Sequence, residues 1–126
     1  MELNCVLLYV KDFARMREFY SNMLGVAPAH SPWPDTWAVF ELPGASLALH
    51  AIPDEIAKGI SIASPPEARE QSPIKLIFTV DNLPSELARL EALGVTLIQR
   101  PWQDASQSCD GLDPEGNVFQ IAARAQ

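Results

Sequence analysis

The chain has few cysteines, few basic residues and no long apolar run, and each shortage excludes classes of function. Two cysteines, Cys5 and Cys109, provide no disulfide framework, so a reducing cytoplasm is the expected location. With 9 Lys and Arg against 16 Asp and Glu, the net charge is -7, and no basic cluster offers a surface for nucleic acid. No apolar run approaches the roughly 20 residues of a membrane span, and residues 1–4 lack the features of a secretory signal. The sequence predicts a cytoplasmic protein without membrane or nucleic-acid partners.

An internal repeat is the most informative feature that is present. Residues 10–13 (Val-Lys-Asp-Phe) and 24–26 (Leu-Gly-Val) return as residues 80–83 (Val-Asp-Asn-Leu) and 93–95 (Leu-Gly-Val). A unit of about 55 residues is marginally stable alone. We therefore expect one domain over residues 1–126, in which two repeated units pack together and build a cavity that neither encloses by itself.

The first unit, residues 1–52, reads as strand, helix and three strands. An apolar run over 3–10 predicts the first strand, and Asp12 and Gly25 suit the start and the end of a helix. Further strands are predicted over 26–29, 36–42 and 45–52. Five apolar residues recur at the spacing of one helix face, and together they form an apolar stripe, namely Phe13, Met16, Tyr20, Met23 and Leu24.

The second unit, residues 74–126, repeats this order. Strands are predicted over 74–80, 95–99, 106–112 and 117–123, and a type I turn over 113–116 (Asp-Pro-Glu-Gly) joins the last two. The helix between the first two strands has Pro84 in its first turn, Gly94 at its end and the stripe Leu83, Leu87 and Leu90. Residues 53–73 form the linker, with a short helical turn near 54–58. The predicted class is α+β.

This doubled order resembles the vicinal oxygen chelate superfamily, which includes glyoxalase I, bleomycin-resistance proteins, fosfomycin-resistance enzymes and extradiol dioxygenases. The resemblance covers nearly the whole chain and is most specific in residues 9–12, 19–20, 24–26, 78–81, 90–95 and 113–117. It implies two βαβββ units whose strands curl into a half-open sheet with the helices outside and the site on the concave face. It also implies a homodimer, formed side by side or by exchange of units through the linker.

The two-residue period of a strand assigns side chains to the cavity or to the helices. Val6, Leu8 and Val10 are expected to face the helix, as are Leu47, Leu49, Leu76, Phe78, Val80, Phe119 and Ile121. The alternate residues are expected to face the cavity, namely Cys5, Leu7, Tyr9, Ala48, His50, Lys75, Ile77, Thr79, Val118 and Gln120.

The superfamily carries one metal ligand on each of four strands, and by resemblance these positions are Cys5, His50, Lys75 and Gln120 here. A Lys ammonium has no lone pair, and Gln120 offers a neutral amide where a carboxylate is usual. We therefore expect no metal and no other cofactor. A divalent metal held by Cys5, His50 and Gln120 is the alternative. Glyoxalase I and extradiol dioxygenase activities are not expected, because the ligand set is incomplete and an amide cannot shuttle a proton.

Lys75 and His50 are the candidate catalytic residues. The charge of Lys75 could bind a carboxylate, phenolate or phosphonate oxygen, and His50 beside it would favour its neutral form. Trp33, Trp37 and Trp102 could form the walls of a pocket for a flat molecule. The candidate ligand-binding residues are Cys5, Leu7, Tyr9, Trp33, Trp37, His50, Lys75, Ile77, Trp102 and Gln120.

Each candidate also has a structural interpretation. Lys75 could be solvated at a rim, Cys5 could act as a small hydrophobic residue, and the tryptophans could close the barrel ends or an interface. Three classes of function remain. The first is a binder of a small aromatic or amphipathic, possibly anionic, molecule without the usual metal. The second is an enzyme of lyase, isomerase or oxygenase type that uses a divalent metal or His50 and Lys75. The third is a non-catalytic partner subunit.

Overall fold

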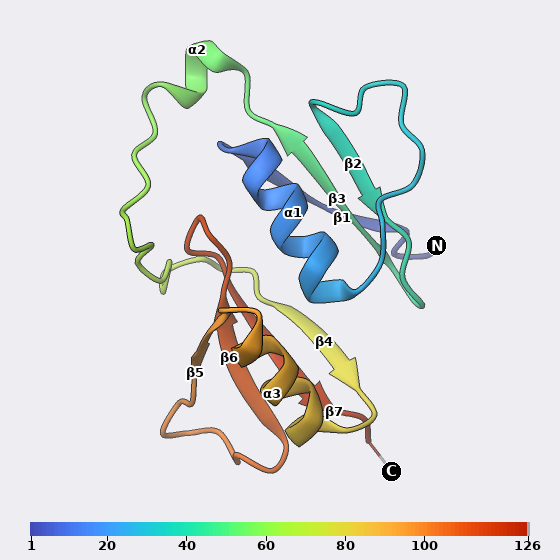
Figure 1. Cartoon of the computed structure of the whole chain (residues 1–126), viewed down its shortest axis with the longest axis vertical. Coiled ribbons are helices and arrows are strands. Elements are labelled where there is room, and N and C mark those ends of the chain that lie inside the picture. Colours follow the sequence, from blue (N-terminus) through green and yellow to red (C-terminus); the bar gives the residue numbers. More distant parts are fainter. Residues whose placement is uncertain (126) are drawn as a thin grey trace. The chain divides into compact units, whose positions relative to one another are not determined.

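The computed structural model describes residues 1–125 and divides into two compact units, Met1–Ser61 and the part from Ile62 onward. The division lies inside the predicted linker, and each unit has its own sheet and its own main helix (Figure 1). The α+β class and the repeat of strand, helix and further strands are confirmed. Among residues 1–125, every helix is too short or too polar to cross a bilayer.

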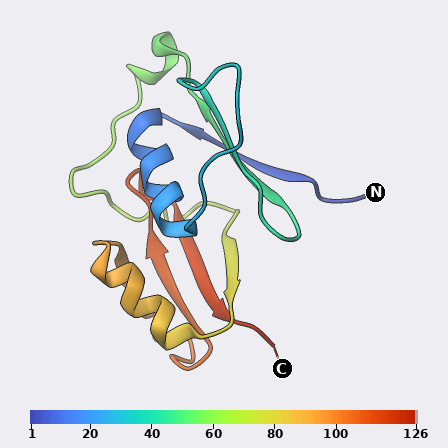
Figure 2. The same ribbon diagram turned by 45° about the vertical axis from the view of Figure 1, so that its right-hand side comes forward.

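The first unit consists of β1 (Cys5–Val10), α1 (Phe13–Leu24), β2 (Trp37–Phe40), β3 (Ser46–Ala51) and the short α2 (Asp54–Ala57). Its sheet has the order β1-β3-β2, with β1 parallel and β2 antiparallel to β3. The helix α1 covers one face of this sheet (Figure 2). The other face is therefore the one that a ligand could reach within this unit.

The helix α1 forms where the apolar stripe predicts it. Asp12 accepts a hydrogen bond from the backbone N–H of Arg15 at 3.2 Å, and Gly25 ends the helix in the left-handed region at φ 69°. The stripe is buried through Phe13, Met16, Tyr20 and Met23. It packs on the helix-facing residues of the sheet, which are also buried, namely Val10, Phe40, Leu47 and Leu49.

The second unit consists of β4 (Leu76–Val80), α3 (Leu83–Ala92), β5 (Thr96–Ile98), β6 (Ser108–Leu112) and β7 (Val118–Ala123). Its sheet has the order β4-β7-β6-β5, with β4 parallel to β7 and the other pairs antiparallel. The predicted turn between β6 and β7 is confirmed by a hydrogen bond of 3.0 Å from the N–H of Gly116 to the carbonyl of Asp113. The carboxylate of Asp113 also accepts from the backbone N–H groups of Glu115 and Asn117.

The strand predicted over residues 26–29 is wrong. The backbone there makes one hydrogen bond to a strand, from the N–H of Ala29 to the carbonyl of Val39 at 2.8 Å, and the carbonyl of Val26 accepts from the Ser21 hydroxyl at 3.1 Å instead. Pro28 lies in this stretch and has no N–H to donate to a ladder, which explains why apolar composition does not produce a strand. The sheet of the first unit consequently has three strands, whereas that of the second has four.

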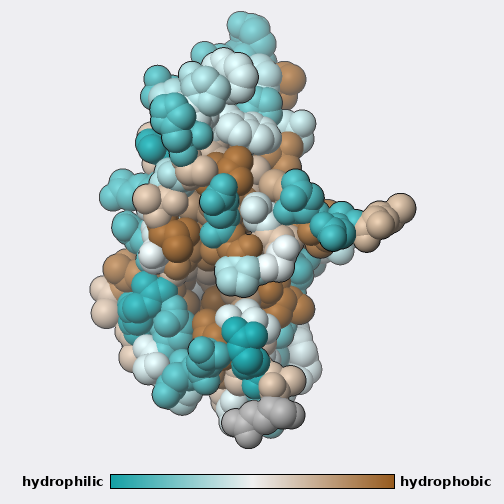
Figure 3. All heavy atoms as spheres, turned by 90° about the vertical axis from the view of Figure 1, so that its right-hand side faces the viewer, coloured by the Kyte–Doolittle hydropathy of each residue, from teal (hydrophilic) through white to brown (hydrophobic). Residues whose placement is uncertain are grey.

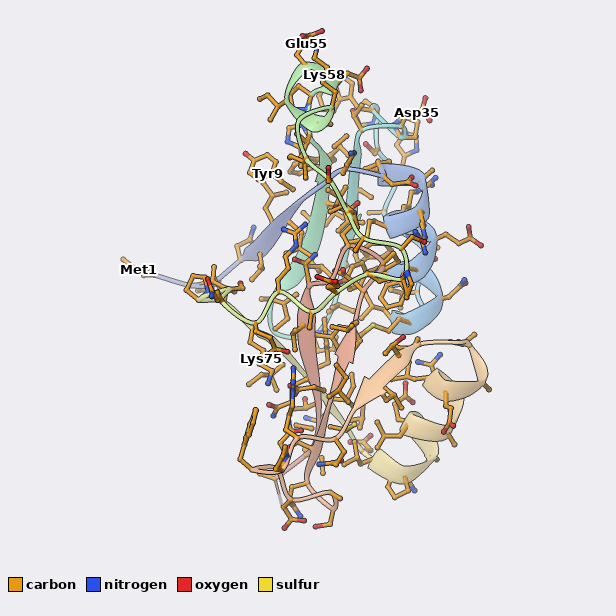
Figure 4. All side chains as sticks on the ribbon, turned by 90° about the vertical axis from the view of Figure 1, so that its left-hand side faces the viewer. Met1, Tyr9, Asp35, Glu55, Lys58 and Lys75 are labelled. Atoms are coloured by element: carbon orange, nitrogen blue, oxygen red, sulfur yellow. The ribbon has the colours of Figure 1, made fainter. Side chains whose placement is uncertain are left out.

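The predicted alternation of side chains along the opening strands is confirmed. Tyr9 on β1 is 63% exposed and Ile77 on β4 is 58% exposed, whereas the next residues, Val10 and Phe78, are buried and half-buried, respectively. Figure 4 shows Tyr9 on the side of β1 away from α1. On the side of the molecule drawn in Figure 3, hydrophobic residues reach the surface in groups between hydrophilic ones.

Replacing Asn82 by Ala should lower the free energy of unfolding by about 1 kcal/mol. The side chain of Asn82 accepts a hydrogen bond of 3.0 Å from the backbone N–H of Ser85 at the start of α3. Asn82→Asp keeps this acceptor and is the matched control. Urea unfolding of the two variants measures the difference, and equal losses would contradict the capping role.

Candidate functional site

The face of the first sheet opposite α1 brings three predicted site residues together. His50 on β3 is the register partner of Tyr9 on β1 and of Trp37 on β2. The centroid of the imidazole lies 5.7 Å from that of Tyr9, with 33° between the rings, and 5.4 Å from that of Trp37, with 74° between the rings. These distances are typical of aromatic contacts. We call this group the aromatic cluster (Tyr9, Trp37 and His50).

The aromatic cluster combines apolar ring surface with hydrogen-bonding groups. The imidazole ring can donate and accept hydrogen bonds, and the two neighbouring rings offer a flat apolar surface. A patch of this kind suits a ligand that has an aromatic face and one polar substituent. The phenol of Tyr9 and the indole N–H of Trp37 are two further hydrogen-bonding groups of the cluster.

Cys5 lies on the same face as the aromatic cluster but far along the strand. Its register partner is Ser46, four residues before His50 on β3. At about 3.3 Å per residue, this separates Cys5 from His50 by about 13 Å along the sheet. Metal–sulfur and metal–nitrogen bonds of zinc are about 2.0–2.3 Å long, so side chains that rise in parallel from these positions cannot share an ion. The thiol of Cys5 instead points to the carbonyl of Val6, at 3.6 Å.

The two remaining candidates of the first unit lie at the edge of this face. Leu7 lies between Cys5 and Tyr9 on the same face of β1 and is partly exposed. Trp33 lies in a turn before β2. Its backbone carbonyl accepts hydrogen bonds from the N–H groups of Thr36 and Trp37. Its ring is mostly exposed, so it does not fill the core of this unit.

On the open face of the second sheet, Asp110 is the shared acceptor of a group of hydrogen bonds, and the sequence did not predict this residue as part of a site. Ile77 on β4 is opposite Gln120 on β7, and Gln120 is opposite Asp110 on β6. The carboxylate of Asp110 is 1% exposed. It accepts hydrogen bonds from three donors, namely Lys75 Nζ at 2.8 Å, Arg100 Nε at 3.1 Å and Gln103 Nε2 at 2.7 Å.

These hydrogen bonds determine the charge of Asp110. Burial raises the pKa of the carboxyl group, but the hydrogen bonds from Lys75, Arg100 and Gln103 outweigh burial and hold the pKa below its usual value. Hydrogen bonds to Glu70 and Asp110 raise the pKa of Arg100. Asp110 is therefore ionised at neutral pH and Arg100 carries its full charge. We call this group the carboxylate cluster (Lys75, Arg100, Gln103 and Asp110).

Lys75 therefore does not offer an unpaired ammonium. It lies on the segment that enters β4 (Figure 4), and its side chain is 34% exposed. Its charge is compensated by a buried carboxylate of the same unit. An anionic ligand would meet Lys75 as one member of a cluster that also contains Arg100, and not as an isolated charge.

Trp102, another predicted site residue, lies next to Arg100. The guanidinium carbon of Arg100 is 5.6 Å from the centroid of the Trp102 ring, within the range of a cation–π contact. The ring is 74% exposed. The carboxylate cluster therefore has an aromatic surface beside it.

Cys109 is on β6 next to Asp110 but faces the helix side. It is buried, and burial together with the charge of Asp110 raises the pKa of its thiol. The thiol is therefore protonated at neutral pH and is not an activated nucleophile.

The residues present do not fit the divalent metal of the superfamily. Within either unit, no three His, Cys, Asp or Glu side chains among residues 1–125 are close enough to hold an ion. Lys75 donates to Asp110 as an ammonium group, and Cys5 lies far from His50 along the sheet. Gln120 offers only a neutral oxygen. No reaction step is therefore assigned to a metal.

The second unit also contains an open cavity of about 500 Å³ at the amino end of α3. Its walls include Asp81, Asn82 and Leu83 on one side and Gln107, Ala123 and Arg124 on the other. An ion pair of 2.8 Å between Arg124 and Asp81, both exposed, lies at its edge. None of the predicted site residues lines this cavity, so it is separate from both clusters.

Comparison with known proteins gives a consistent picture. A family described as glyoxalase-like domain matches residues 5–122. A glyoxalase/dioxygenase structure from Nostoc punctiforme has a TM-score of 0.74 at 18% identity, covering 99% of this chain and 92% of that one. A fosfomycin resistance protein, FosX, from Listeria monocytogenes has a TM-score of 0.69 at 17% identity, with coverages of 98% and 90%.

A third structure has the higher identity of 26%. It is a glyoxalase/bleomycin resistance protein/dioxygenase family enzyme from Burkholderia phytofirmans, with a TM-score of 0.66 and 98% coverage of both chains. Among curated proteins none matches the chain. The structural matches extend over nearly the whole chain and agree with the fold of two repeated modules in two mixed sheets.

Proposed function

Because the chain belongs to the glyoxalase-like family of the vicinal oxygen chelate superfamily, we propose that it binds a small aromatic or amphipathic molecule on the open faces of its sheets without a divalent metal. The observation that supports this best is the aromatic cluster, in which His50 lies between Tyr9 and Trp37. Such a patch supplies apolar contact area and hydrogen-bonding groups beside it.

The metal-free part of the proposal rests on the donor set. A Listeria monocytogenes FosX mutant was crystallised in complex with Mn(II) and a dihydroxypropylphosphonic acid. In this chain the four positions that the superfamily resemblance assigns to metal ligands hold a thiol, an imidazole, an ammonium in an ion pair and an amide. The ligand would instead be recognised by side chains directly.

Trp37→Leu should weaken the binding of 2-naphthol, a flat molecule with one hydroxyl, at least tenfold. The substitution removes one of the two rings beside His50, and aromatic contacts of this kind contribute about 0.5–1.5 kcal/mol beyond area burial. Isothermal titration calorimetry measures the affinity. Ile56→Ala removes an exposed apolar side chain on α2 and is the control. Equal affinities of wild type and Trp37→Leu would contradict a role for the cluster.

Protein purified without affinity metals should contain far less than one equivalent of Zn, Mn, Ni or Fe. Its melting temperature should not change with EDTA, since no metal would stabilise the folded state. Stoichiometric metal that is lost in His50→Ala would contradict the proposal and favour the metal-dependent enzyme.

The same proposal includes assembly and location. Leu7 and Tyr9 on the first sheet and Ile77 on the second are exposed apolar side chains, and a homodimer would cover part of such surface. Light scattering should give twice the chain mass of 13.8 kDa. A cytoplasmic location agrees with the two cysteines, both of which are free.

A further inference from the structure

The carboxylate cluster holds more positive than negative charge. Lys75 and Arg100 are both cations, whereas Asp110 is one anion and Gln103 is neutral. Two cations that point to one place repel each other, and the buried carboxylate between them keeps both in position. Asp110 thus acts as a positioning residue that leaves one positive charge for another anion to neutralise.

That second anion is at present a side chain of the same unit. Glu70 accepts a hydrogen bond of 2.6 Å from Arg100 Nη2, while Arg100 Nε is directed to Asp110. The two carboxylates differ in exposure, because the Glu70 side chain is 55% exposed and the Asp110 side chain 1%. Because the Glu70 carboxylate is largely solvated and the Asp110 carboxylate is buried, Glu70 can leave Arg100 at a lower cost than Asp110 can.

The aromatic surface beside Arg100 indicates what would replace Glu70. The exposed ring of Trp102 lies 5.6 Å from the guanidinium carbon. A ligand carboxylate on Arg100 would therefore place an attached aromatic ring within reach of Trp102. Arg is well suited to this task, because its planar group binds carboxylates through two parallel N–H donors.

We propose that Arg100, Trp102 and Lys75, held in place by Asp110, form a subsite for an aromatic carboxylate, and that Glu70 occupies this subsite until the ligand displaces it. The inference rests on the proposed function and specifies the class of ligand. It assigns the polar recognition of the ligand to Arg100, a residue outside the four positions of the superfamily's metal site.

The test compares 2-naphthoate with 2-naphthol by titration calorimetry. Glu70→Gln should bind 2-naphthoate about threefold more tightly than wild type, since it removes the carboxylate that competes with the ligand for Arg100. Arg100→Lys should bind 2-naphthoate at least tenfold more weakly, because it keeps the charge but loses the planar donors. The affinity for 2-naphthol should be unchanged in both variants.

Glu55→Gln is the matched control. Glu55 is an exposed glutamate paired with Lys58 at 2.8 Å in the first unit, so its substitution changes net charge equally without touching the cluster. An equal gain in affinity for 2-naphthoate in Glu55→Gln and Glu70→Gln would show that the gain comes from net charge alone, and would overturn the proposal. Unchanged binding of 2-naphthoate by Arg100→Lys would also overturn it.

The two proposals fail in different ways. If 2-naphthol binds through Trp37 but 2-naphthoate gains nothing from Arg100, the carboxylate subsite is wrong and the proposed function stands. If 2-naphthoate binding depends on Arg100 and Glu70 while Trp37→Leu has no effect on 2-naphthol, the aromatic cluster is wrong and the subsite stands. If neither compound binds, both proposals are overturned.

Discussion

Asp110→Asn should lower the free energy of unfolding by about 3 kcal/mol, the lower end of the cost of breaking a buried ion pair. The carboxylate of Asp110 is buried and accepts hydrogen bonds from Lys75, Arg100 and Gln103. An amide accepts fewer of these bonds and carries no charge, so two cations would remain without their shared anion. Lys75 is partly exposed and can turn toward water, which limits the loss. Urea unfolding at pH 7 measures it.

The loss of stability caused by Asp110→Asn should depend on pH. The folded-state pKa of Asp110 is below its ordinary value, so the folded state favours the charged carboxylate. This contribution to stability is fully present above the unfolded-state pKa of about 3.9 and is lost as pH falls through the folded-state pKa. The difference between wild type and Asp110→Asn should therefore be constant near neutrality and shrink below about pH 4. A difference that grows on acidification would contradict this assignment.

Gly116→Ala should lower the free energy of unfolding by about 3 kcal/mol, through left-handed strain and steric overlap. Gly116 has a φ of 84°, and a Cβ there would overlap the backbone carbonyl oxygen of Glu67. That oxygen belongs to a segment that docks on the turn, since the N–H of Arg69 donates to the carbonyl of Gly116 at 2.9 Å and Arg69 Nε donates to that of Glu115 at 3.0 Å. Urea unfolding measures the loss.

Gly44→Ala separates the two causes. Gly44 has a similar φ of 89°, but a Cβ there would meet nothing within 4 Å. Its substitution should therefore cost only the strain of the left-handed conformation, about 1 kcal/mol. The additional loss in free energy of unfolding of Gly116→Ala, compared with Gly44→Ala, measures the contribution of the Glu67 segment that docks on the turn. Losses of equal size at the two glycines would show that this docking contributes nothing.

Most of the fold could be predicted because its signals are local. Asp12 and Gly25 mark the ends of α1, Pro84 and Gly94 mark those of α3, and each helix has an apolar stripe. The error at residues 26–29 has a local cause as well. The apolar composition favours a strand there, but Pro28 lacks an N–H and excludes regular pairing.

The candidate site could be predicted only in part, because it depends on side chains from separate elements. Strand alternation predicts Tyr9 and His50 on one face, whereas Trp37 is predicted only as a possible pocket wall; the strand register brings the three rings together. The other two donors to Asp110 could not be found in this way, since Arg100 and Gln103 lie after β5 in irregular chain. Asp110 could have been recognised as a candidate from the sequence. It is a charged residue in a strand whose neighbours Cys109 and Leu112 are buried, and a buried carboxylate requires donors.

The parallel pairing of the first strand with the last strand in each unit affects how the protein folds during synthesis. β1 pairs only with β3 in its sheet, so Cys5 has no register partner until Ser46 has been made. Ribosomes add about 5–20 residues per second, which leaves β1 waiting for some seconds. Sheets that pair distant segments form slowly for the same reason. Truncated chains that end before β3 should therefore expose an unpaired, apolar β1 and be substrates for chaperones.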